Sequence, residues 1–205
     1  AGSPKETGVL NHIDSTVLRI NRRHAKKFSQ SYAVDEPEAD EVPGYESFSE
    51  LAGDVDSLLD LLWVTGTPSI QVPYMISLAG LVNSYLPDFP WQARSTFTLL
   101  AKMDVIFASL LQGVDVLSGQ VLAGFEDRTN QVSVTEKVRI KSLVEGTRVT
   151  VFDVRDQEDE DEDEEDEDED EEDEDEVEDV AVGRWEMAAA RVYERTVQLL
   201  GDDLS

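Results

Sequence analysis

The sequence predicts an all-α protein, an irregular antiparallel bundle of about five to six helices interrupted by a disordered acidic insert. Three observations support this fold class. Apolar residues recur at spacings of three and four in several stretches, turns with proline or glycine separate these stretches, and one long acidic run has nothing apolar to bury. The 205 residues are enough for one domain with a sizeable core.

The stretch Pro90–Gly113 has the most apolar helical pattern of the chain. Its apolar side chains would cover most of the helix surface: Phe97, Leu99, Leu100, Met103, Ile106, Phe107, Leu110 and Leu111. A helix of this kind has to be buried among other elements. Pro90 suits a first helical turn and Gly113 suits a stop, so we expect a central helix here.

Asp104 interrupts the apolar stripe of this central helix. A buried carboxylate needs a cation or hydrogen-bond donors beside it. We expect a structural partner for Asp104, because nothing in the sequence complements it for catalysis.

Residues 8–32 are predicted to form a basic amphipathic helix, after a disordered N-terminus at residues 1–7. The apolar seam of this helix contains Leu10, Ile13, Val17, Ile20 and His24. Its other faces carry Arg19, Arg22, Arg23, Lys26 and Lys27. We expect a bundle helix with a solvated cationic face. The alternatives are recognition of an acidic partner or of a nucleic-acid backbone, and docking on the chain's own acidic tract.

An acidic linker is predicted at residues 33–46, where prolines and a glycine leave no periodicity. A helical core is predicted at residues 47–155. Its first helix occupies residues 47–65, and Ser47 with Glu50 forms a capping box at its start.

The second core helix is predicted at residues 69–86, and Pro68 is able to start it. Pro73 marks either the true start of this helix or a kink within it. The short connection at residues 87–91 contains two prolines, which implies that the neighbouring helices are antiparallel.

The end of the core is less clear in the sequence. Residues 118–131 have a loop-like composition, and Ser133 with Glu136 gives a second capping box. The acceptable apolar stripe after it consists of Ile140, Leu143, Val144, Val151 and Val154. Arg148–Val154 would form a strand if it were isolated, but a lone strand is unstable, so one long helix is favoured.

A disordered acidic tract is predicted at residues 156–179. It holds 22 of the 46 acidic residues, including the unbroken run Glu158–Glu176. Within this run like charges at every i,i+4 pair disfavour a helix, and no apolar residue is available for a core. Outside the tract 24 acidic residues face 17 basic ones, so most of the net charge of −29 belongs to this segment.

A C-terminal helix is predicted at residues 180–201, packing back on the core. Its seam consists of Val182, Trp185, Ala189, Val192, Thr196 and Leu199, and Gly201 is the expected C-cap. The alternative is a tethered recognition helix for the groove of a partner.

The composition offers little catalytic chemistry. The chain has no cysteine, and its two histidines, His12 and His24, lack the spacing of a helical metal pair. We find no phosphate-binding loop and no serine elbow, so we predict a non-enzyme without cofactor or metal. No apolar run reaches the roughly 18 residues that cross a membrane. The chain begins Ala-Gly-Ser-Pro, which is consistent with an excerpt, so a missing targeting signal carries little weight.

Three functions remain. The first is a helical adaptor or scaffold subunit of a larger nuclear protein assembly, with the cytoplasm as the alternative location. The second is an acidic chaperone for basic clients such as histones or ribosomal proteins. The third is a nucleic-acid-associated factor that uses the basic first helix.

These functions assign candidate residues. The candidates for binding a protein partner are Leu10, Ile13, Val17, Ile20, Arg22, Arg23, Lys26, Lys27, Trp185, Val192 and Leu199. The candidates for binding a basic client are Glu158, Asp166 and Glu176.

Overall fold

A computed structural model describes residues 4–29, 42–126, 132–165 and 187–203. The numbered helices are α1 (Pro4–Ser29), α2 (Phe48–Val64), α3 (Pro68–Tyr85), the 3₁₀-helix η1 (Leu86–Asp88), α4 (Ala93–Gln112), α5 (Val134–Glu165) and α7 (Glu194–Asp203). Within the described residues the β structure is limited to one isolated antiparallel bridge, between Val114 and Val121. The predicted all-α bundle is therefore confirmed.

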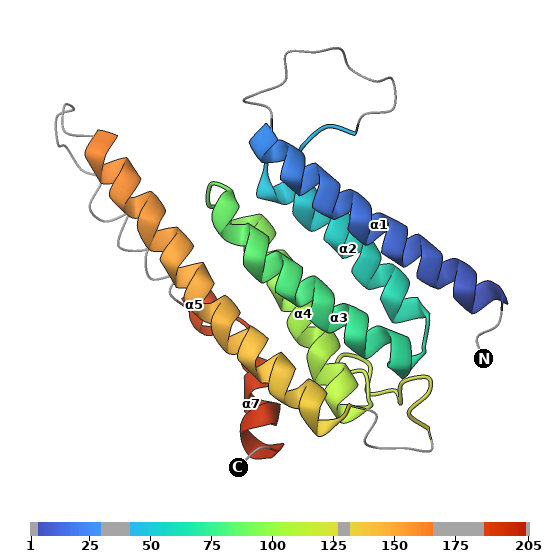
Figure 1. The fold of residues 1–205 in the computed structure, drawn as a ribbon. Coiled ribbons are helices and arrows are strands. Elements are labelled where there is room, and N and C mark those ends of the chain that lie inside the picture. The colour runs from blue at the N-terminus through green and yellow to red at the C-terminus, as the bar shows by residue number, and fades with distance from the viewer. Residues whose placement is uncertain (1–3, 30–41, 127–131, 166–186, 204–205) are drawn as a thin grey trace.

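Consecutive helices alternate in direction, which places α1, α3 and α5 parallel to one another and antiparallel to α2 and α4 (Figure 1). The core lies where α2, α3 and α4 meet, covered by α1 on one side and by α5 and α7 on the other. Buried core side chains come from each of these helices: Ile20, Leu59, Ile76, Phe107, Val144 and Leu200.

The central helix α4 is buried as predicted, and its end is the predicted one. Gly113 adopts the left-handed conformation, with φ of 70°, and its N–H donates to the Ser109 carbonyl. The start differs from the prediction, because α4 begins at Ala93 and Pro90 lies outside it. Phe107 is buried, whereas Phe97 is half-buried and packs edge-on against Trp91, with ring centroids 5.5 Å apart.

Local signals place the starts of α2 and α5 correctly. The Ser47 hydroxyl accepts a hydrogen bond from the Glu50 N–H at 3.4 Å. At α5 the capping box is complete, because Glu136 also accepts a bond from the Ser133 N–H at 2.8 Å. Pro73 lies inside α3, which begins at Pro68.

Arg148–Val154 is helical, as favoured, because α5 runs without interruption through Glu165. The helix thus enters the tract that was predicted to be disordered from residue 156. Adding residues to an existing helix costs little, and glutamate is a good helix former, so α5 extends past its packed part.

Two further boundaries differ from the predictions. Residues 4–7, expected to be disordered, belong to α1, since proline is tolerated in a first turn and Glu6 suits that position. The end of the expected acidic linker is packed, because Gly44 and Tyr45 are buried.

The C-terminal segment is not the single helix predicted at residues 180–201. Residues 187–190 are helical, a turn follows at residues 191–193, and α7 then starts at Glu194. Tyr193 adopts a φ of 54°, which breaks the helix. Gly201 lies inside α7 and is not its C-cap.

Candidate protein-interaction surfaces

The apolar seam of α1 is used within the chain. Ile13 and Ile20 are fully buried, and the half-buried Leu10 and Val17 pack against the same core. These four predicted partner-binding residues therefore face the protein's own helices, because the body of the bundle offers them an apolar surface.

The cationic face of α1 is also partly engaged. Arg23 donates to Glu50 at 2.6 Å and to Asp54 at 2.9 Å, and its guanidinium lies 4.0 Å from the centre of the Tyr45 ring. Burial opposes the charge of Arg23, but the hydrogen bonds to Asp54 and Glu50 outweigh it and raise the pKa of Arg23. Burial first, and then the hydrogen bond to Asp54, raise the pKa of the Tyr45 phenol.

The remaining predicted cations of α1 differ in their surroundings. Lys26 Nζ donates to the Val42 carbonyl at 3.1 Å, and Lys27 Nζ lies 4.9 Å from the centre of the Phe89 ring. Arg22 is exposed. Contacts within the chain thus leave fewer cations of α1 available to bind a polyanion.

His24 is buried and has a polar partner. Its Nε2 lies 2.8 Å from Asp88 Oδ2, and its ring stacks on Tyr85 with centroids 3.5 Å apart. The residue therefore ties α1 to the corner at η1. Among the described residues, no group of three possible metal ligands lies close enough together to hold an ion.

Asp104 has the structural partners that its burial demands. Its carboxylate accepts hydrogen bonds from the Thr196 N–H at 2.9 Å and from the Thr196 hydroxyl at 2.7 Å. The Arg195 N–H adds a third bond at 3.3 Å. These N–H groups belong to the first turn of α7, so Asp104 of α4 caps that helix across the bundle.

The other predicted site residues lie only in part within the described chain. Val192 is buried and Leu199 is half-buried, whereas Trp185 lies outside the described residues. Glu158 belongs to α5, and Asp166 and Glu176 lie outside the described part of the chain. Of these residues, the structure thus describes Glu158 on α5 and Val192 and Leu199 in the C-terminal segment.

An apolar stripe runs along the outer face of α5. It is formed by Val134, Val138, Val149 and Phe152, with exposed fractions of 70%, 52%, 59% and 38%. At 100° per residue these positions fall within about 60° of one another, and they span about 27 Å of helix. The opposite face of α5 carries the predicted stripe with Ile140, which packs on the core.

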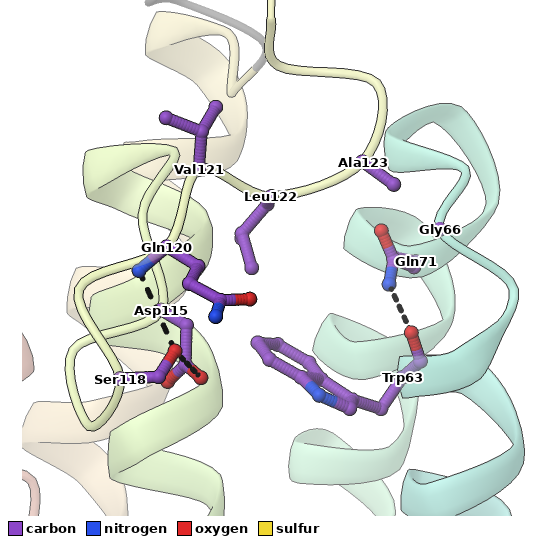
Figure 2. Close-up of a pocket in the computed structure, with 9 residues that line it drawn as sticks. All are labelled: Trp63, Gly66, Gln71, Asp115, Ser118, Gln120, Val121, Leu122 and Ala123. Carbon is purple, nitrogen blue, oxygen red and sulfur yellow. Dashed lines mark hydrogen bonds between the residues drawn. The ribbon is translucent and has the colours of Figure 1, made fainter.

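A second candidate surface lies where the α2–α3 turn meets the loop that follows α4 (Figure 2). A cavity of about 200 Å³ opens there, with Trp63 and Gln71 on one wall and Asp115 and Gln120 on the other. The Trp63 ring extends into the space between the two walls. We name this cavity the Trp63 pocket.

Close backbone packing fixes the rim of the Trp63 pocket. Gly66 and Gly124 have φ of 55° and 81°, which favours glycine at both positions. A Cβ on Gly124 would lie 2.6 Å from Pro68 Cδ, and one on Gly66 would lie 2.9 Å from Ala123 Cβ. The loop and the α2–α3 turn therefore hold each other in place.

Hydrogen bonds position the polar groups of the pocket. Gln71 Nε2 donates to the carbonyls of Leu62 and Trp63 at 3.1 and 3.0 Å, which closes the end of α2. Gln71 Oε1 is buried and accepts no hydrogen bond from any described residue, a state that costs about 1–3 kcal/mol. Across the pocket, the Ser118 hydroxyl and the Leu117 N–H donate to Asp115, and these bonds lower the pKa of the Asp115 carboxyl.

Several of the exposed large apolar residues are associated with these two surfaces. Four of them form the stripe on α5, Val121 lines the Trp63 pocket, and Val64 and Leu117 are adjacent in the sequence to lining residues of that pocket. Sequence reasoning missed both surfaces. Residues of the pocket come from distant segments, and only the opposite face of α5, with Ile140, was singled out in the sequence.

Comparisons with known proteins identify the family. The TFB6 family, described as subunit 11 of the general transcription factor TFIIH, matches residues 44–201. No curated protein and no solved structure matches the chain. The matched region contains α2 to α5, the acidic tract and most of α7, whereas α1 precedes it. The chain therefore belongs to the TFB6 family of TFIIH subunits and is a component of a nuclear multi-protein complex.

Proposed function

We propose that this chain is a non-enzymatic adaptor subunit, which binds other protein subunits of TFIIH through the outer face of α5. The observation that carries the proposal is the exposed apolar stripe of Val134, Val138, Val149 and Phe152. Exposed apolar side chains that recur on one face of a helix are typical of a protein-interaction site. Family membership supplies the class of partner.

The packing of the other amphipathic faces supports the choice of α5. The seam of α1 and the buried face of α7 are covered by the bundle itself, so neither offers a comparable surface in this arrangement. Lys141 and Glu145 lie on the same face of α5, between Val138 and Val149, so the stripe consists of two apolar pairs separated by charged residues.

The test is assembly of TFIIH around a tagged copy of the full chain. Val138→Asp and Val149→Asp place charges on the stripe, and we expect each to reduce recovery of the other TFIIH subunits severalfold. Leu18→Asp, on the 49% exposed position of α1, is the matched control and should leave recovery unchanged. Circular dichroism verifies that all three variants fold. Unchanged recovery with folded α5 variants would refute the proposed interface.

A second candidate function is binding of basic clients by the acidic tract. The concentration of 22 acidic residues between Asp156 and Asp179 favours it, and α5 projects into the start of this segment. Deletion of residues 158–176 should then abolish binding to purified histones, and binding by the intact chain should weaken steeply as salt rises. Equal histone binding by the deleted and intact chains would exclude this function.

Nucleic-acid binding by α1 is the third alternative. The intrachain contacts of Arg23, Lys26 and Lys27 weigh against it, because these cations already have partners. Charge reversal at these three positions and at Arg22 should abolish any salt-dependent mobility shift of nucleic acid.

A further inference from the structure

The Trp63 pocket has the electrostatic character of a cation site. Residues 63–71 and 113–126, which supply its walls and rim, contain no lysine and no arginine. Asp115 contributes a carboxylate whose pKa is lowered, chiefly by the bond from Ser118 and next by that from Leu117. The pocket therefore presents negative charge at neutral pH with no basic residue in either segment to neutralise it.

An aromatic face adds a second element of recognition. Trp63 is half-buried, and its ring lies between the α2 side of the pocket and the loop that carries Asp115 (Figure 2). A tryptophan face attracts cations, most of all planar guanidinium groups, which stack on it. On the α3 side, Gln71 Oε1 is a buried acceptor that has no donor among the described residues.

The size and the rim of the pocket indicate how such a cation would arrive. A volume of about 200 Å³ is smaller than the sites of about 300–1,000 Å³ that hold most small-molecule ligands, and it suits a single side chain. Val121 lines the pocket and is 59% exposed, and Val64 and Leu117, adjacent in the sequence to the lining residues Trp63 and Ser118, are 77% and 72% exposed. This rim suits apolar neighbours of the inserted side chain.

We propose that the Trp63 pocket is a docking site for an arginine side chain that a partner protein carries between apolar residues. The guanidinium would stack on Trp63 and donate hydrogen bonds to Asp115, while the flanking apolar residues cover Val64, Leu117 and Val121. Arginine is favoured over lysine because it combines planar stacking with paired donors. This site is separate from the α5 stripe and goes beyond the proposed adaptor function.

The test uses the full chain and a defined probe, the capped pentapeptide Val-Leu-Arg-Leu-Val. Titration followed by ¹⁵N NMR should shift the Trp63 indole resonance and the amides of residues 115–123. The same peptide with citrulline in place of arginine loses the positive charge and should bind roughly tenfold more weakly. A lysine peptide should also bind more weakly than the arginine peptide.

Two variants of the protein complete the test. Asp115→Asn should weaken binding of the arginine peptide roughly three- to tenfold, because a charge-assisted contact is lost. Asp153→Asn removes a carboxylate from an exposed position of α5 outside the stripe and should leave the affinity unchanged. The Asp115→Asn variant keeps most of the hydrogen-bonding capacity of Asp115, and its amide spectrum verifies the fold.

Three results would overturn the proposal. They are shifts located away from the pocket, equal binding of the arginine and citrulline or lysine peptides, and an Asp115→Asn variant that binds as the parent does. None of these results bears on recovery of TFIIH subunits through α5, so failure of this site is distinguishable from failure of the adaptor function.

Discussion

Asp104 shows how one polar residue is accommodated in the apolar centre of the bundle. Its carboxylate is almost completely buried, and Thr196 and Arg195 supply the hydrogen bonds that replace water. Because two of the donors are first-turn N–H groups of α7, the carboxylate also stabilises the start of that helix through its dipole. The residue is therefore a structural joint between α4 and α7.

Asp104→Ala should destabilise the protein by about 3 kcal/mol, because a buried cap and hydrogen bonds to a charged group are lost together. Urea denaturation measures the free energy of unfolding. The control is Asp153→Ala, at an exposed position of α5, which should change stability by less than about 0.5 kcal/mol. Similar losses in the two variants would contradict the role of Asp104 as a cap.

Two glycines of the loop after α4 distinguish the cost of backbone strain from the cost of steric overlap. Gly124 and Gly119 have φ of 81° and 73°, so alanine is strained at both positions. A Cβ at Gly124 also overlaps Pro68, whereas nothing lies within 4 Å of one at Gly119. Gly124→Ala should therefore cost about 1–3 kcal/mol more than Gly119→Ala in thermal or urea unfolding. Equal costs would show that the loop moves freely away from Pro68.

Among the helices, those whose apolar stripe and capping residue lie in the same stretch of sequence were predictable from the sequence. Ser47 and Glu136 mark the starts of α2 and α5, and Gly113 marks the end of α4. The break at Tyr193 was not predictable, since the apolar spacing runs through it unchanged. The residue that caps α7 beyond this break is Asp104, which lies far away in the sequence.

The Trp63 pocket was also not predictable, because its residues are far apart in the sequence. Trp63 lies near the C-terminal end of α2 and Asp115 lies in the loop after α4, so no local spacing in the sequence relates them. The signal that was available is the glycine content of residues 113–124, which marks a loop held in tight turns. The contact between Gly124 and Pro68 forms only in the folded protein, so the sequence alone does not indicate it.

A buried isoleucine attaches α1 to the rest of the bundle. Ile20→Ala removes a fully buried side chain between α1 and the body and should cost about 2–5 kcal/mol. Leu18→Ala, two residues earlier and half exposed, should have little effect on stability. Hydrogen exchange should show faster opening of α1 in the Ile20 variant than in the Leu18 variant. Equal exchange would mean that α1 is held mainly by its polar contacts.

At the scale of the whole molecule, tyrosine hydroxyls join the peripheral segments to the body. Tyr74 of α3 donates to Asp14 of α1, Tyr45 donates to Asp54 of α2, and Tyr193 contacts the Met103 sulfur at 3.3 Å. Burial raises the pKa of Tyr45 and of Tyr193, and the bond to Asp14, followed by burial, raises the pKa of Tyr74 to about 12. All three phenols thus stay protonated in the folded state at a pH that ionises them in the unfolded chain.

The sign of the resulting pH dependence follows from linkage. Between pH 10 and 12 the unfolded chain has released the phenolic protons and the folded chain still binds them, so the free energy of unfolding falls as pH rises. This contribution is fully present below about pH 10, and for Tyr74 it is lost as pH rises through about 12.

Tyr74→Phe removes one of the linked protons, so the free energy of unfolding of this variant should fall less steeply with pH between pH 10 and 12. Urea denaturation at several pH values measures both slopes, with Ser77→Ala on the same helix as the control that should keep the parent slope. A parent and a Tyr74→Phe variant with identical slopes would show that the phenol does not hold α1 to α3 in solution.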